Sequence, residues 1–202
     1  MNILPVMISC RSREAVRTAT LANLAATDWP RDRMPFVRID DSEAERPQER
    51  QEKNSQAALQ WGLDSAADWI LFLEDDLDFN LHLWHNLSHW SPLIQSRIGL
   101  ASLYNPIIVE QSRNDYQHFF IANPYAVYGS QAFVIGRDCA QFILQHWDRV
   151  PGMQDIKCSR LAAEYGSAIY YHSPSLVQHV GQVSAWGGRF HWAPDFSRDF
   201  KV

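Results

Sequence analysis

Residues 68–76, with the sequence DWILFLEDD, decide the fold of this chain. Residues 69–73 are a continuous apolar run, which is typical of a strand buried on both faces of a parallel sheet. The run ends directly in three carboxylates, and α/β proteins place their ligands at the carboxyl ends of such strands. The stretch therefore predicts a central buried strand with a functional acidic group at its end.

Two other short apolar runs also end in polar groups. Residues 3–8 and residues 34–39 each predict a strand. Because the carboxyl ends of parallel strands meet at one edge of a sheet, we expect their terminal groups to gather beside the acids. These groups are Ser9, Cys10, Arg11, Asp40 and Asp41.

Strand and helix patterns alternate along the first half of the chain, which predicts an α/β fold with a mixed, mostly parallel sheet flanked by helices. Pro5 predicts an irregularity or a sheet edge in the first strand. The charged residues 43–53 predict a solvated loop. The expected helices cover residues 13–26, 55–67 and 80–90 and begin again at Asp138 and Asp155; further strands are expected at 98–103, 131–135 and 168–171.

Composition excludes several classes of protein. Of the 202 residues, 46% are apolar and 20% charged, which suits a packed core and excludes disorder and coiled coil. A net charge of −5 argues against broad nucleic-acid binding. No apolar run approaches the ~18 residues of a membrane-spanning helix. Three cysteines without metal spacing predict buried thiols in the cytoplasm.

Glu74, Asp75 and Asp76 require compensation of their charge. Two unit charges about 4 Å apart repel by about 4 kcal/mol at an effective dielectric constant of 20. Such a cluster needs a cation or a protonated member, and Mg²⁺ or Mn²⁺ is the natural partner of carboxylate oxygens. The alternative is an acidic turn that caps the next element. The position after the most buried strand favours the ion.

Three other candidates have ordinary explanations when the residues are considered alone. His179 is more often a packed or surface histidine than a ligand, although imidazole suits Mn²⁺. Asp155 at a helix start is a preferred N-cap, and its functional alternative is a general base. His85 and His89 have the i, i+4 spacing of a metal pair, but no acid is placed as in a His-Glu-x-x-His motif, which favours a polar helix face.

Taken in order, these segments resemble those of the GT-A-fold glycosyltransferases. Residues 70–76 (ILFLEDD) look like the metal-binding acidic motif of that family, in which Asp76 is the usual metal contact. Residues 174–181 (PSLVQHVG) resemble the C-terminal segment whose histidine, here His179, completes the metal site. Asp155 matches the usual place of the catalytic base in inverting members.

The resemblance implies one GT-A-like domain over residues 1–202, with a nucleotide-sugar-binding half (1–100) and an acceptor and catalytic half (101–202). It implies that Mn²⁺ or Mg²⁺ is held by Glu74, Asp76 and His179. The donor would be a nucleoside-diphosphate sugar, with UDP expected. The residues expected to contact it are Cys10, Arg11, Asp40, Asp41, Asn54, Glu74, Asp75, Gly129, Ser130, Gln131, Ser184 and Trp186.

The implied activity is transfer of the sugar to an acceptor hydroxyl with inversion, in which Asp155 accepts the proton. The acceptor is a glycan, a small molecule or a nucleobase. Two alternatives stay open: a binding module without turnover, and a glycosyltransferase that acts on DNA bases. A nucleotidyltransferase would carry a Gly-rich, Lys-containing loop after the first strand, and the sequence has none.

Overall fold

A seven-stranded mixed sheet forms the centre of the computed structural model, which describes residues 2–40, 46–95, 98–106, 118–182 and 190–202. The strand order is β2 (Phe36–Asp40), β1 (Ile3–Cys10), β3 (Trp69–Leu73), β7 (Ala132–Gly136), β5 (Leu100–Ser102), β8 (Ile169–His172) and β6 (Phe119–Ala122). β7 and β6 run opposite to the other five strands. The mixed, mostly parallel sheet expected from the sequence is confirmed.

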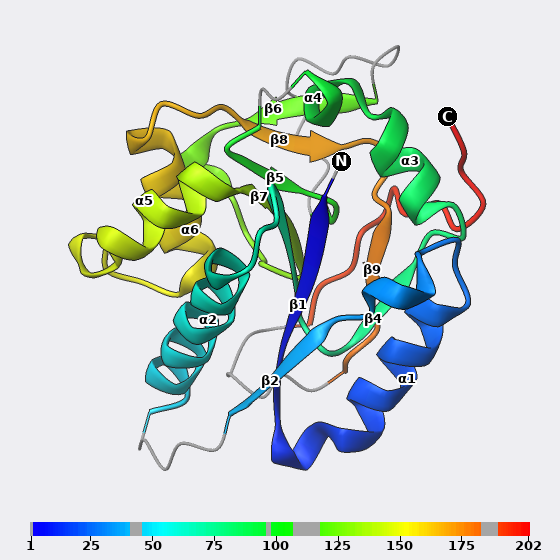
Figure 1. Cartoon of the computed structure of the whole chain (residues 1–202), viewed down its shortest axis with the longest axis horizontal. Coiled ribbons are helices and arrows are strands. Elements are labelled where there is room, and N and C mark those ends of the chain that lie inside the picture. Colours follow the sequence, from blue (N-terminus) through cyan, green and yellow to red (C-terminus); the bar gives the residue numbers. More distant parts are fainter. Residues whose placement is uncertain (1, 41–45, 96–97, 107–117, 183–189) are drawn as a thin grey trace.

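Helices cover both faces of the sheet (Figure 1). One face carries α2 (Pro47–Asp64), α5 (Arg137–Gln145) and α6 (Gln154–Glu164). The other carries α1 (Glu14–Ala25), α3 (Leu83–His89), α4 (Ser91–Ile94) and a small antiparallel sheet of β4 (Leu77–Phe79) and β9 (Val177–His179). Short 3-10 helices are η1 (Arg11–Arg13), η2 (Arg31–Arg33), η3 (Pro124–Ala126) and η4 (Trp147–Arg149).

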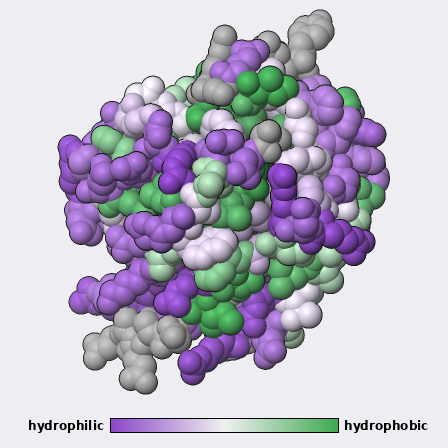
Figure 2. Space-filling model, in the orientation of Figure 1, coloured by the Kyte–Doolittle hydropathy of each residue, from purple (hydrophilic) through white to green (hydrophobic). Residues whose placement is uncertain are grey.

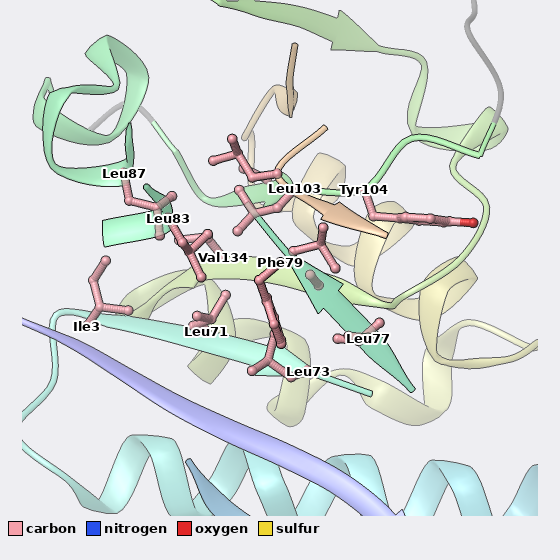
Figure 3. Close-up of a cluster of buried hydrophobic side chains, with 14 of the residues drawn as sticks. Ile3, Leu71, Leu73, Leu77, Phe79, Leu83, Leu87, Leu103, Tyr104 and Val134 are labelled. Atoms are coloured by element: carbon pink, nitrogen blue, oxygen red, sulfur yellow. The ribbon is translucent and has the colours of Figure 1, made fainter. Parts of the chain in front are cut away.

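Side-chain alternation along β3 divides the core between these two faces. Leu71 and Leu73 pack toward α1 and α3, in the cluster that Figure 3 shows. Ile70 and Phe72 pack toward α2, α5 and α6. Both faces of β3 are covered, so the strand has no solvent-facing side on which polar residues could alternate with apolar ones. Its sequence is therefore a continuous apolar run.

Several elements differ from the sequence-based expectation. α2 begins at Pro47, so part of the expected charged loop is helical. Its Gln, Glu, Arg and Lys residues are good helix formers, and proline is tolerated in a first helical turn. The edge predicted from Pro5 is wrong, because β1 lies between β2 and β3, although pairing with β2 begins only at Val6. β4 and β9 were not expected.

The three cysteines are buried and free, as predicted. Burial raises the pKa of the Cys139 thiol to about 12, so this group stays protonated and unreactive at neutral pH. Cys139 on α5 and Cys158 on α6 both lie in the buried cluster on the face of the sheet that α2, α5 and α6 cover. These two thiols are therefore part of the packing.

Much of the molecular face in Figure 2 is hydrophilic, with smaller hydrophobic areas among the hydrophilic side chains. Large exposed hydrophobic residues come from several parts of the chain, among them Ile94, Tyr125, Tyr128, Phe190 and Trp192. Among the described helices, none combines the length and hydropathy needed to cross a membrane.

Substitution Phe72→Ala is expected to lower the free energy of unfolding by about 3–5 kcal/mol, because it leaves a cavity beneath α2 and α5. Phe36→Ala is the control: Phe36 is 37% exposed and stacks on Trp61, so the loss should be smaller. Urea denaturation measures both. Equal losses for the two variants would contradict the central place given to β3.

Candidate active site

The three acids lie in the turn between β3 and β4, which is fastened from two sides. From the β7 side, the Glu74 N–H donates to the carbonyl oxygen of Gln131 at 3.0 Å. From α1, the buried Thr20 hydroxyl donates to the carbonyl oxygen of Asp75 at 2.7 Å and accepts from the Leu77 N–H at 2.9 Å. The backbone of the acidic turn is therefore fixed to the sheet and to α1.

Arg13, in η1 after β1, pairs with two of the acids. Its Nε lies 2.8 Å from Asp75 Oδ1, and its Nη2 lies 2.5 Å from Asp76 Oδ2. The Ser9 hydroxyl donates to the other oxygen of Asp75 at 2.5 Å. Sequence reasoning did not assign Arg13 to the site, although an arginine directly beyond the first strand end was a usable signal.

The short β4–β9 ladder places His179 beside Asp76, 103 residues away in the sequence. Leu77 is opposite His179 in this ladder, and the Val180 N–H donates to the Asp76 carbonyl oxygen at 2.9 Å. His179 Nε2 lies 3.2 Å from Asp76 Oδ2, while Nδ1 is 2.8 Å from the carbonyl oxygen of His191. The ring is therefore oriented with Nε2 toward the acid.

Asp76 is 4% exposed, and its carboxylate is tightly enclosed. Oδ2 accepts from both Arg13 and His179, whereas Oδ1 has no hydrogen-bond partner among the described residues. A Cβ added at Gly181 would overlap the carboxylate. This close approach gives a physical reason for the glycine in the His-Val-Gly segment.

The charges of the turn are balanced within the chain. Burial acts to raise the pKa of Asp76, but the hydrogen bond and charge of His179 and the charge of Arg13 outweigh it, so this pKa is lowered. Burial, together with repulsion from Asp76, raises the pKa of Glu74 to about 7. Desolvation opposes the charged form of His179, but Asp76 raises its pKa. The sequence favoured a divalent ion as the compensating cation; within the chain, the guanidinium of Arg13 lies against Asp75 and Asp76, and Glu74 has a raised pKa.

Two side chains after η3 hold Glu74 in place. Ser130 Oγ donates to Glu74 Oε1 at 2.8 Å, and Gln131 Nε2 lies 3.4 Å from Oε2. This brings Ser130 and Gln131, which were expected to contact the donor, against the acidic turn. Gly129, directly before them, has a φ of +80°, a conformation that favours glycine.

Asp155 lies in the first turn of α6, which begins at Gln154. It is therefore not the N-cap, a position that Met153 occupies. Its Oδ2 accepts from the Gly129 N–H and its Oδ1 from the Ile156 N–H, each at 2.9 Å. These two donors fix the carboxylate beside the segment that holds Glu74.

Tyr104 and His191 lie near the metal-ligand candidate His179, and the sequence did not indicate either. The Tyr104 hydroxyl lies 2.6 Å from His191 Nδ1, and Figure 3 shows this hydroxyl directed away from the hydrophobic cluster. A Cβ at Gly129 would lie 3.4 Å from His191 Cε1. The His191 and His179 ring centroids are 5.0 Å apart. His191 therefore lies close to His179 and beside Gly129, whose N–H donates to Asp155.

The ends of β1 and β2 form the other part of this edge. Cys10 and Asp40 are paired in register, and Arg50 of α2 donates to Asp40 Oδ2 at 2.7 Å. Asn54 donates to a backbone carbonyl near the end of β1 at 3.1 Å. Arg11 is exposed in η1. Three predicted site residues lie outside the described residues: Asp41, Ser184 and Trp186.

The donor set at Asp76 and His179 fits a divalent ion. Their facing atoms are 3.2 Å apart, close to the about 3 Å between adjacent ligands of an octahedral ion with bonds of about 2.1 Å. His179 also donates its other N–H to a carbonyl, as metal-bound histidines usually do.

Across the described ranges, no three His, Cys, Asp or Glu side chains form a group placed to hold an ion. The rings of His85 and His89, both in α3, stack on each other. No third ligand side chain among the described residues joins this pair. At the acidic turn, the chain offers a pair of donors, and the remaining ligands would be water and phosphate oxygens, as is usual for Mg²⁺.

No model of a known protein family matches the chain, and no curated protein sequence does. Among solved structures, A197 from STIV matches with a TM-score of 0.58 at 15% identity, over 100% of this chain and 95% of that one. A mutant Drosophila β-1,4-galactosyltransferase 7 with manganese, UDP-Gal and xylobiose matches with a TM-score of 0.57 at 13% identity, over 90% of this chain and 71% of that one. The chain has a GT-A fold. S. aureus TarS with UDP matches with a TM-score of 0.54 at 13% identity, over 86% of this chain and 61% of that chain.

The fold predicted from the resemblance is therefore confirmed. At 13–15% identity these likenesses concern the fold alone. Within the GT-A sheet of this chain, the acidic turn follows β3, between the ends of β1 and the segment that leads into β7.

Substitution Glu74→Gln is expected to stabilise the GT-A domain more at pH 8 than at pH 5. The carboxyl has a pKa of about 7 in the folded protein against 4.5 as its ordinary value, so the stability that it contributes when protonated is lost as pH rises toward 7 and above. Glutamine carries no charge and keeps an acceptor for Ser130. Urea denaturation at both pH values measures the effect, with the exposed Glu49→Gln as control. A difference between variant and wild type that is independent of pH would contradict the raised pKa.

Proposed function

We propose that the protein is a metal-dependent glycosyltransferase that moves a sugar from a nucleoside-diphosphate donor to an acceptor hydroxyl. The observation that carries this proposal is the meeting of Asp76 and His179 at the carboxyl edge of a GT-A sheet. The structural neighbours with UDP-Gal and manganese, and with UDP, support a UDP-sugar as donor.

Asp76 and His179 would hold Mn²⁺ or Mg²⁺, and Glu74 lies beside them in the same turn. The ion, when bound, supplies a Lewis acid that stabilises the negative charge of the departing diphosphate. Ser130 and Gln131 orient Glu74 toward this region through their contacts with its carboxylate. Cys10, Asp40 and Asn54, at the ends of β1 and β2, are proposed to line the nucleoside end of the donor site.

Asp155 is the proposed general base. Its two oxygens are held by the N–H groups of Gly129 and Ile156, and each oxygen keeps a lone pair for a further hydrogen bond. The acceptor hydroxyl gives its proton to Asp155 while its oxygen bonds to C1 of the sugar. The bond from C1 to the phosphate oxygen breaks, its electron pair leaves with the nucleoside diphosphate, and the configuration at C1 inverts.

A nucleotide-sugar-binding module without turnover is the second candidate. The observation that favours it is the pairing of Arg13 with Asp75 and Asp76, which balances the acids without a bound ion. The two candidates differ in one product: only the enzyme releases nucleoside diphosphate from its donor.

Substitution Asp76→Asn is expected to remove the Mn²⁺-dependent part of UDP binding. For the wild type, UDP with Mn²⁺ should raise the melting temperature more than UDP alone, since a ligand at about 100 times its Kd stabilises by about 2.7 kcal/mol. A thermal-shift panel of nucleotides with and without Mn²⁺ measures this. Asp78→Asn, two residues along, is the control. Unchanged Mn²⁺ dependence in Asp76→Asn would remove the acidic site from the proposal.

Substitution Asp155→Asn is expected to lower the transfer rate by about 10²–10⁴-fold, because the amide cannot accept the acceptor proton. The shift in melting temperature with UDP and Mn²⁺ should persist. Release of UDP from UDP-sugars in the presence of candidate acceptors measures the rate, and the exposed Asp148→Asn is the control. Near-wild-type transfer by Asp155→Asn would exclude this residue as the base.

A further inference from the structure

The guanidinium of Arg13 is the cation that lies against the carboxylates of the acidic turn. It spans two carboxylates, with Nε 2.8 Å from Asp75 Oδ1 and Nη2 2.5 Å from Asp76 Oδ2. The Arg13 side chain is 13% exposed and the two carboxylates are 7% and 6% exposed. The pair is therefore largely withdrawn from water, where charge-assisted hydrogen bonds are strong.

The same oxygen of Asp76 faces the metal-ligand candidate on the other side. Oδ2 accepts from Arg13 and lies 3.2 Å from His179 Nε2. A divalent ion bound between Asp76 and His179 would be brought close to the guanidinium. Like charges so close in a buried place repel strongly, so the ion and Arg13 cannot both have their full interaction with Asp76.

We propose that Arg13 is a built-in competitor of the divalent ion for Asp76, which keeps metal affinity low while no donor is bound. A donor diphosphate offers anionic oxygens that can take over the guanidinium, so metal binding becomes coupled to donor binding. This inference rests on the proposed function, because it takes Asp76 and His179 as the metal ligands.

The surroundings indicate that Asp75 does not depend on Arg13 alone. The Ser9 hydroxyl donates to Asp75 Oδ2, and Arg17 of α1 donates to the same Ser9 oxygen at 2.9 Å. Loss of the Arg13 charge thus leaves Asp75 with a hydrogen bond and a neighbouring cation. We therefore expect the variant Arg13→Gln to fold.

The test measures binding of Mn²⁺ alone, from the signal of free Mn²⁺ in electron paramagnetic resonance, in the wild type and in Arg13→Gln. The variant is expected to bind Mn²⁺ about tenfold more tightly, a coupling of ordinary size between two ligands of one site. Arg198→Gln is the matched control, since it removes one charge paired with Asp78, two residues from Asp76, and should leave the affinity within about twofold. Equal or weaker binding by Arg13→Gln would overturn the competition.

Asp76→Asn separates this failure from that of the proposed function. If the wild type binds Mn²⁺ and Asp76→Asn does not, the metal site stands, and Arg13→Gln decides the competition alone. If neither the wild type nor Arg13→Gln binds Mn²⁺, even with UDP, the metal site and the competition both fail.

A measurement on the wild type keeps the test decisive where Arg13→Gln does not fold. In spectra of ¹⁵N-arginine-labelled protein, saturating Mg²⁺ should speed rotation about the Cζ–Nη2 bond of Arg13, because the bond to Asp76 is released. Unchanged rotation at saturating Mg²⁺ would overturn the competition.

Discussion

The compensation of Asp75 and Asp76, two buried carboxylates at the end of a buried strand, is the constraint on which the rest of the site depends. Each group that meets this demand comes from a different part of the chain: Arg13 from the end of β1, and His179 from β9. Because a buried charge without a partner costs several kcal/mol, these elements must pack in one arrangement. The electrostatics of the turn thereby favour the arrangement in which η1 and β9 both lie beside it.

The features that the sequence predicted are those that depend on the pattern of neighbouring residues in the chain. β3 is recognisable because burial on both faces leaves an apolar run without polar interruption. The acids follow that strand by chain connectivity alone, so the place of Glu74 and Asp76 at a sheet edge followed at once. Asp155 in the first turn of a helix was likewise a local signal, although the N–H partner at Gly129 was not.

The features that the sequence did not predict depend on contacts between distant residues. β4 and β9 have three residues each, which is too short for a periodic pattern, and their pairing alone brings His179 to Asp76. The sequence predicted a divalent ion as the partner of the acids, and the contact of the Arg13 guanidinium with Asp75 and Asp76 became visible only in the folded arrangement. His191 and Tyr104 are joined by one hydrogen bond that no local pattern encodes.

The GT-A fold determines where a divalent ion could bind, and the chemistry of this site determines whether an ion is needed. The fold brings the strand ends together, whereas the need for an ion depends on how much negative charge the edge must hold. Without a donor, the guanidinium of Arg13, the imidazole of His179 and the weakly acidic Glu74 meet that need. Under the proposed function, a donor diphosphate would add negative charge at the same edge, and a divalent ion would balance it. The proposal therefore expects the ion to be needed most when the donor is present, which is when a departing diphosphate must be stabilised.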